Sequence, residues 1–100
     1  MDTDTQVFRF LLNKGQLDPQ QYHHVEEIAQ AINRSRRKNL SAVDVEKALH
    51  GTRYRMAKNV CAMVPGHEQP YEIVEYKNGD VSARACIFAI RYPQDYGWKE

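Results

Sequence analysis

The chain has 100 residues, of which 42% are hydrophobic and 27% charged, and its formal net charge at pH 7 is +1. This length and composition are typical of one globular domain with a single hydrophobic core. No stretch approaches the roughly 18 apolar residues of a membrane span, and the acidic start MDTDTQVFRF lacks the apolar region of a secretory signal. We therefore expect a cytoplasmic protein. A small chain that begins with its own Met1 is more typical of a regulator, inhibitor or adaptor than of an enzyme.

Two helices are expected in the first third of the chain. The first, around residues 4–14, has an apolar stripe at helical spacing and Gly15 as its natural end. The second is expected to start at Pro19, with Asp18 as its N-cap, and to end in basic residues that suit the negative end of a helix dipole. The two stripes consist of Val7, Phe8, Leu11 and Leu12 in the first helix and Tyr22, Val25, Ile28, Ala29 and Ile32 in the second.

Two more helices are expected before the chain changes its pattern. Ser41 can cap the third helix, with Asp44 at the capping-box position, and Val45, Ala48 and Leu49 facing inward. Gly51 is expected to end that helix. A fourth helix should then run from about 53 to 63, before Pro65 and Gly66.

The last third of the chain has the pattern of a β-hairpin. Asn78-Gly79 favours a two-residue type I′ turn, which pairs Tyr76 with Val81. The apolar run that follows, residues 85–90, should continue the second strand against the helices. The expected fold is therefore α+β: a compact bundle of about four short helices (residues 4–64) with a C-terminal antiparallel β-hairpin (about 71–91) packed on it, in one domain that spans residues 1–100.

Positive charge is concentrated in the middle of the chain. Residues 34–58 contain eight Lys or Arg against two acids, a balance of +6, so the rest of the chain sums to 1 − 6 = −5. Such a stretch is either a surface for nucleic acid or the solvated side of ordinary helices.

The stretch SAVDVEKALHGTRYRMAKNV resembles a helix-turn-helix unit with Gly51 in its turn, although one residue too many precedes the glycine. The hairpin that follows resembles the wing of winged-helix proteins, with Lys77 and Asn78 at its tip. The resemblance implies that polar and basic residues of these helices meet phosphates and base edges. The candidate nucleic-acid-binding residues are Arg34, Arg36, Arg37, Lys38, Arg53, Tyr54, Arg55, Lys58 and Asn59.

A different class of function is a protein-interaction inhibitor or adaptor that acts through the hairpin and the aromatic tail. Tyr92, Tyr96 and Trp98 are of the types that anchor protein interfaces, and equally of the types that fasten a tail to a core. Under this alternative we expect a protein that is encoded by a phage or mobile element and acts on a host protein.

Catalytic and metal-binding signatures are not found in the sequence. His23 and His24 are adjacent and would diverge by about 100° on a helix, while Cys61 and His67 have no zinc-site spacing. There is no glycine-rich phosphate loop and no nucleophile motif. We therefore expect no enzymatic activity, no metal and no cofactor, and we expect Cys61 and Cys86 to be unbridged thiols.

Overall fold

The computed structural model describes residues 3–56 and 69–96, with the side chains of residues 52–56 excepted. The described part contains four α-helices and a three-stranded antiparallel sheet, which confirms the expected α+β class. In chain order the elements are α1 (Thr3–Leu17), β1 (His23–His24), α2 (Val25–Arg36), α3 (Ala42–Met56), β2 (Tyr71–Glu75), β3 (Val81–Ala85), α4 (Ile87–Arg91) and the short 3-10 helix η2 (Pro93–Tyr96).

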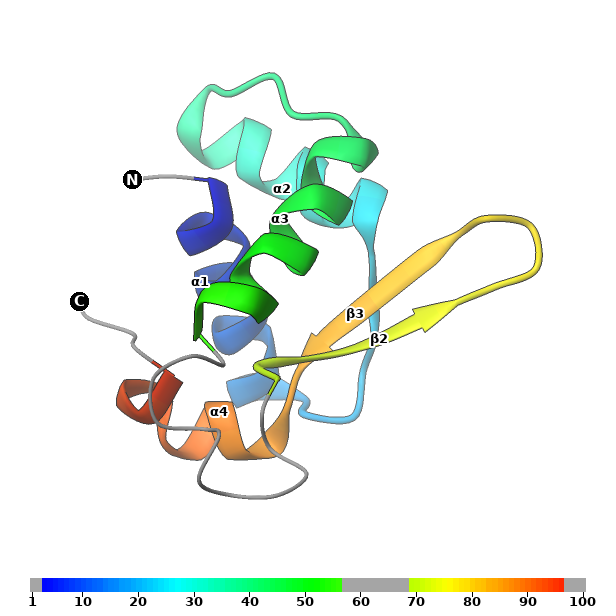
Figure 1. Ribbon diagram of the computed structural model, residues 1–100. Coiled ribbons are helices and arrows are strands. Elements are labelled where there is room, and N and C mark those ends of the chain that lie inside the picture. The colour runs from blue at the N-terminus through cyan, green and yellow to red at the C-terminus, as the bar shows by residue number, and fades with distance from the viewer. Residues whose placement is uncertain (1–2, 57–68, 97–100) are drawn as a thin grey trace.

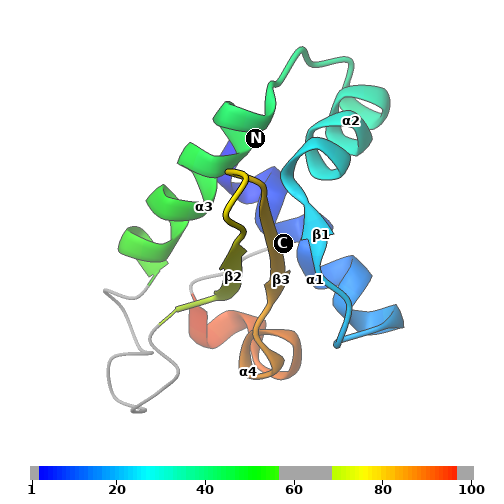
Figure 2. The same ribbon diagram turned by 90° about the vertical axis from the view of Figure 1, so that its right-hand side faces the viewer.

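The helices α1, α2 and α3 pack on one another, and the hairpin of β2 and β3 projects from them (Figure 1). The sheet order is β1-β3-β2, so β3 is the central strand and also packs against α1. Figure 2 shows the hairpin between α3 and the segment of β1 that leads into α2. Helix α4 lies at the other end of the molecule from the α2–α3 connection (Figure 1).

The core is formed by the apolar faces of these elements. The expected stripes of α1 and α3 are buried, and so are the four stripe residues of α2 that lie within that helix. The sheet and the C-terminal segment complete the core with Tyr71, Val81, Ala83, Ala85, Ala89 and Tyr96. None of the described helices is long and apolar enough to cross a membrane.

Helix α1 does not end at Gly15 as expected, but continues to Leu17. A Cβ atom built on Gly15 would lie 2.5 Å from Cδ1 of Ile90. Because this residue has no side chain, α4 can approach α1 closely at this point.

The expected start of the second helix at Pro19 is also wrong. Asp18 caps a turn instead, since its carboxylate accepts a hydrogen bond from the backbone N–H of Gln20 at 3.0 Å. His23 and His24 then form β1, which pairs with β3, and α2 begins at Val25. The ring of His24 caps α2 by accepting from the N–H of Glu26 at 3.3 Å. A strand of two residues is defined by its partner and leaves no periodic signal in its own sequence.

The third helix begins as expected and ends later than expected. The hydroxyl of Ser41 accepts from the N–H of Asp44 at 3.2 Å, and the Asp44 carboxylate accepts from the N–H of Ser41 at 2.9 Å, which confirms the capping box. Gly51 lies inside α3, which runs on to Met56. Residues 53–56 of the expected fourth helix thus belong to α3, and residues 57–63 lie outside the described part of the chain.

The hairpin exists, but its turn and register differ from those expected. The N–H of Tyr76 bonds to the carbonyl of Asp80 at 2.9 Å, and the N–H of Gly79 bonds to the carbonyl of Tyr76 at 3.0 Å. This is a three-residue loop in which Gly79 has φ +83° and Asn78 is not left-handed. Glu75, not Tyr76, therefore pairs with Val81.

This one-residue shift exchanges the two faces of β2. The expected pairing of Tyr76 with Val81 would have placed Ile73 opposite Arg84. Ile73 instead pairs with the buried Ala83, while Val74 pairs with Ser82. The expected continuation of the strand to residue 90 is also wrong, because β3 ends at Ala85 and residues 87–91 form α4. The hairpin is accordingly not the last element of the chain.

Cys86 connects β3 to α4. Its sulfur accepts a hydrogen bond from the N–H of Ala89 at 3.3 Å, and its thiol donates to the hydroxyl of Tyr96 at 3.5 Å. Cys86 is a free, buried thiol, as expected, and Cys61 lies outside the described residues.

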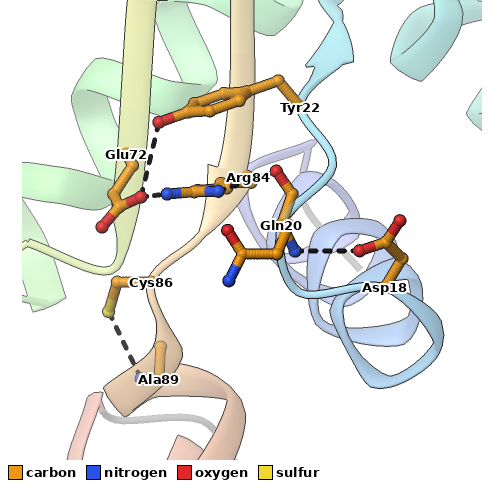
Figure 3. A network of polar contacts seen from close by, with 7 residues as sticks. All are labelled: Asp18, Gln20, Tyr22, Glu72, Arg84, Cys86 and Ala89. Carbon is orange, nitrogen blue, oxygen red and sulfur yellow. Dashed lines mark hydrogen bonds and ion pairs between the residues drawn. The ribbon is translucent and has the colours of Figure 1, made fainter.

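Arg84 fastens the loop after α1 to the hairpin (Figure 3). Its guanidinium donates to the Glu72 carboxylate at 2.5 Å and to the carbonyl of Gln20 at 2.7 Å. It also lies over the ring of Tyr22, 4.4 Å from the ring centroid. The segment between α1 and β1 is thereby held in one position.

Candidate nucleic-acid interface

Four cations are grouped where α2 ends. Arg34 and Arg36 belong to the last turn of α2, Arg37 is its C-cap, and Lys38 follows. The three arginine side chains are exposed and Lys38 is half-buried. Within the described part of the chain, no acidic group lies at ion-pair distance from any of them. We call Arg34, Arg36, Arg37 and Lys38 the α2-end cluster.

The backbone that carries the α2-end cluster is held by side chains. The amide of Asn33 donates to the carbonyl of Leu40 at 3.0 Å and accepts from the N–H of Leu40 at 2.7 Å. Arg37 turns the chain out of the helix with φ 53° and ψ 39°. Together with the capping box at Ser41, these bonds fix both ends of the connection, so the cations are attached to an ordered turn rather than to a loose loop.

The start of α3, next to this cluster, is acidic. The pKa of Asp44 is lowered, first by the hydrogen bond from the backbone N–H of Ser41 and then by the Ser41 hydroxyl, with a smaller effect of Lys47. Its carboxylate therefore stays ionised at neutral pH. Glu46 adds a second acid, so residues 42–50 hold two acids and one cation, Lys47.

The hairpin tip also carries acidic side chains beside its basic one. Lys77 and Asn78 are exposed at the tip, where the sequence places them, but Glu75 and Asp80 are exposed beside them. The Asn78 side chain is engaged locally, because its amide donates to the Asp80 carboxylate at 2.7 Å. The described parts of α3 and of the hairpin tip thus offer phosphate little net attraction.

The helix pair that resembles a helix-turn-helix unit is α2 and α3, with residues 37–41 as the turn. The expected pair, which placed the turn at Gly51, is wrong because α3 passes through that residue without a break. The element order is α1-β1-α2-α3-β2-β3, and β1 pairs with β3. The α2-end cluster therefore lies before the third helix, while Arg53 and Arg55 lie at the end of that helix rather than on a fourth.

The structure brings together only part of the predicted binding set. The residues of the α2-end cluster are near neighbours in the chain, and its three arginine side chains are exposed. Arg53, Tyr54 and Arg55 belong to the last residues of α3, whose side chains are not described. Lys58 and Asn59 lie outside the described residues.

A pocket next to the α2-end cluster was not foreseen from the sequence. It has a volume of about 240 Å³ and lies between α1 and the second half of α2. Arg36, a member of the cluster, is one of its walls, and Arg9 is another. The remaining lining residues are the polar Gln6, Asn13 and Ser35 and the apolar Phe10 and Ile32. The available signal was the helical spacing of residues 6, 9, 10 and 13, which places them along one side of α1.

One residue of the aromatic tail packs into the hydrophobic core. The side chain of Tyr96 is fully buried, so it is not available to a partner. Tyr92 is 50% exposed and its ring centroid lies 4.9 Å from that of Phe88. Trp98 lies outside the described residues. Of the three aromatic residues predicted to form a protein interface, Tyr92 is thus the one with an exposed side chain in the described part of the chain.

The two adjacent histidines have structural partners. Nδ1 of His23 donates to the Glu27 carboxylate at 2.6 Å, and Nε2 of His24 lies 3.5 Å from an oxygen of Asp80. Among the described residues, no group of three His, Cys, Asp or Glu side chains is placed to hold a metal ion. No protein-family model, no curated protein sequence and no solved structure matches this chain.

Proposed function

We propose that this protein is a small non-enzymatic cytoplasmic regulator that binds nucleic acid through the α2-end cluster. The observation that carries the proposal is the grouping of Arg34, Arg36, Arg37 and Lys38 on one ordered turn, with no acidic partner among the described residues. Unpaired cations that are held close together repel one another, and a phosphate backbone relieves that repulsion.

The contact is weak and local. The chain's net charge is only +1, so positive charge at the α2 end is offset by acids elsewhere. Asp44 and Glu46 on α3, together with Glu75 and Asp80 on the hairpin, repel phosphates that extend far beyond the cluster. The protein therefore covers a few phosphates and does not coat a long duplex.

The salt dependence of binding tests this function. If about four phosphates are contacted, log affinity falls with log salt concentration at a slope of roughly −3 to −4. Removing two contacts with Arg34→Ala and Arg37→Ala flattens the slope by about one to two units. The affinity for fluorescently labelled DNA and RNA oligonucleotides, measured by anisotropy from about 50 mM salt upward, gives both slopes.

A charge-matched control separates this cluster from the net charge of the molecule. Lys77→Ala with Arg91→Ala removes the same charge from the hairpin tip and from α4, where both side chains are exposed. This control leaves the slope within about half a unit of wild type. A larger effect for the control than for the α2-end variant, or no salt-sensitive binding at about 50 mM salt, contradicts the proposal.

The second candidate function is a protein-interaction inhibitor or adaptor. Its specific support is the pair of exposed apolar side chains on the α4 segment, Ile87 at 45% and Tyr92 at 50% exposure. An interface of this kind keeps its affinity as salt is raised. A partner recovered from the native host after nuclease treatment, and lost with Ile87→Ala and Tyr92→Ala, would favour this function over the first.

A further inference from the structure

We infer that the preferred nucleic acid is single-stranded, and that the pocket between α1 and α2 accepts one unpaired base while the α2-end cluster holds the neighbouring phosphates. This inference rests on the proposed function and specifies the class of nucleic acid. Its starting point is that Arg36 belongs both to the cluster and to the wall of the pocket. A strand held by the cluster therefore passes the pocket's mouth.

The lining of the pocket suits a base. Phe10 and Ile32 supply apolar contact for a ring, while Gln6, Asn13 and Ser35 supply amide and hydroxyl groups for its polar edge. Arg9 and Arg36 have no acidic partner within ion-pair distance in the described part of the chain, which leaves both guanidinium groups for a phosphate.

One polar atom at this pocket lacks a partner. Gln6 is 7% exposed, and its Oε1 is buried without a hydrogen bond in the described part of the molecule. A buried amide oxygen left without a hydrogen-bond partner destabilises the folded state. An N–H or amino group of a base in the pocket could satisfy this oxygen once the Gln6 amide had turned toward the pocket.

The aromatic wall is held in place by its neighbours. The Phe10 ring packs edge-on against the His23 ring, with centroids 5.7 Å apart and planes at 84°. His23 is itself fixed by its hydrogen bond to Glu27, and Nζ of Lys14 lies 5.6 Å from the Phe10 centroid. Phe10 is thus a preorganised contact surface rather than a freely rotating side chain.

The size of the pocket limits what it can take. Its volume of about 240 Å³ lies below the roughly 300–1,000 Å³ of pockets that hold drug-sized ligands and cofactors. One ring system with its attached sugar edge is a suitable occupant. Bases stacked inside a duplex cannot enter a pocket, whereas bases of a single strand can turn outward.

The experiment compares a labelled 12-nucleotide single strand with the corresponding duplex at one salt concentration, for wild type and pocket variants. Asn13 is exposed on α1, so Asn13→Trp can block the pocket without changing the charge or the core. Gln30→Trp is the matched control, since Gln30 is exposed on α2 and does not line the pocket. Asn13→Ala, which removes only the amide, and circular dichroism of each variant identify any loss that comes from misfolding.

The inference predicts tighter binding of the single strand than of the duplex in wild type. Asn13→Trp weakens single-strand binding at least about five-fold, the loss expected for one base stack, and leaves duplex binding unchanged. Equal binding of both forms, with no effect of Asn13→Trp, overturns the single-strand inference and leaves the proposed function standing. Binding of neither form overturns the proposed function itself.

Discussion

Arg37 combines backbone strain with charge at one position. Among the described residues it is the one non-glycine residue with positive φ, at 53°, and it occupies the C-cap position where glycine is usual. This conformation destabilises a residue with a Cβ atom by about 1 kcal/mol or more. The same side chain extends the α2-end cluster, so its effect on stability and its effect on binding have opposite signs.

Replacing Arg37 with glycine tests this separation. Arg37→Gly should raise the free energy of unfolding by about 0.5–1 kcal/mol, because relief of strain exceeds the greater freedom of glycine in the unfolded chain. It should also weaken nucleic-acid binding, since one cation is lost. Urea unfolding and oligonucleotide binding measure the two effects.

Arg34→Gly is the matched control, because it removes the same charge from within α2. Glycine inside a helix lowers stability by roughly 1 kcal/mol, so this variant should lose both stability and affinity. If Arg37→Gly is less stable than wild type, or binds equally well, the interpretation of Arg37 is wrong.

Asp44 makes the capping box of α3 dependent on pH. Its folded-state pKa lies below the ordinary aspartate value of 3.8, first because the backbone N–H of Ser41 donates a hydrogen bond to the carboxylate and then because of the hydrogen bond with the Ser41 side chain. A depressed pKa means that the carboxylate stabilises the fold above the unfolded pKa, and that this stabilisation is lost as pH falls through the folded value. The stabilisation by the ionised Asp44 carboxylate is therefore fully present at neutral pH.

Asp44→Ala should unfold at lower denaturant concentration than wild type at pH 7, and the difference should shrink steadily below about pH 3.8. Denaturation curves at a series of pH values measure this. A difference that is independent of pH would show that the carboxylate charge has no part in the cap.

At the scale of elements, the hairpin depends on Gly79. Its φ of +83° is required by the three-residue loop. Apart from its two chain neighbours, no heavy atom of the described residues lies within 4 Å of the position that a Cβ would take. A side chain at this position therefore destabilises the fold through the backbone conformation and not through a clash with a neighbouring residue.

Gly79→Val should lower stability by on the order of 1 kcal/mol or more, because a β-branched residue resists positive φ. Gly79→Asn should cost clearly less, since asparagine tolerates the left-handed region. Thermal or urea unfolding of both variants measures the difference. Equal stabilities for the two variants would contradict this explanation of the turn.

The sequence predicts those parts of the fold that depend on local signals. The apolar stripes of α1 and α3 and the Ser41–Asp44 cap are of this kind, and the structure confirms them. The start of α2 was missed because β1 is defined by its pairing with β3, which lies far along the chain. Gly51 was mistaken for a helix end because a glycine inside a helix has the same local pattern as one that stops it.

The register of the hairpin also depends on contacts that the local sequence does not reveal. Asn-Gly is compatible with a two-residue or a three-residue loop. Packing of the partly buried Ile73 on the core, next to the buried Val81 on the inner face, decides between them. The fate of the apolar run after Ala85 also depends on packing, because a short buried run can form a strand or a helix.

For the molecule as a whole, charge is unevenly placed. The α2-end cluster is a continuous run of sequence and could be predicted from it, apart from the residues of α3 that were expected to join it. The pocket could not, because Arg9 and Arg36 lie 27 positions apart and meet only when α1 packs on α2. The acids of α3 and of the hairpin tip leave the end of α2 as the most basic described surface.

The central claim is that nucleic acid meets the molecule at the end of α2 and not on residues 42–50 of α3 or on the hairpin tip. Titration of the isotope-labelled protein with a short single-stranded oligonucleotide, followed by amide chemical shifts, tests this most directly. The shifts should be largest for residues 34–40 and extend to Arg9 and Asn13 on α1. Largest shifts in residues 42–50 and 76–80, or no shifts at about 50 mM salt, would contradict it.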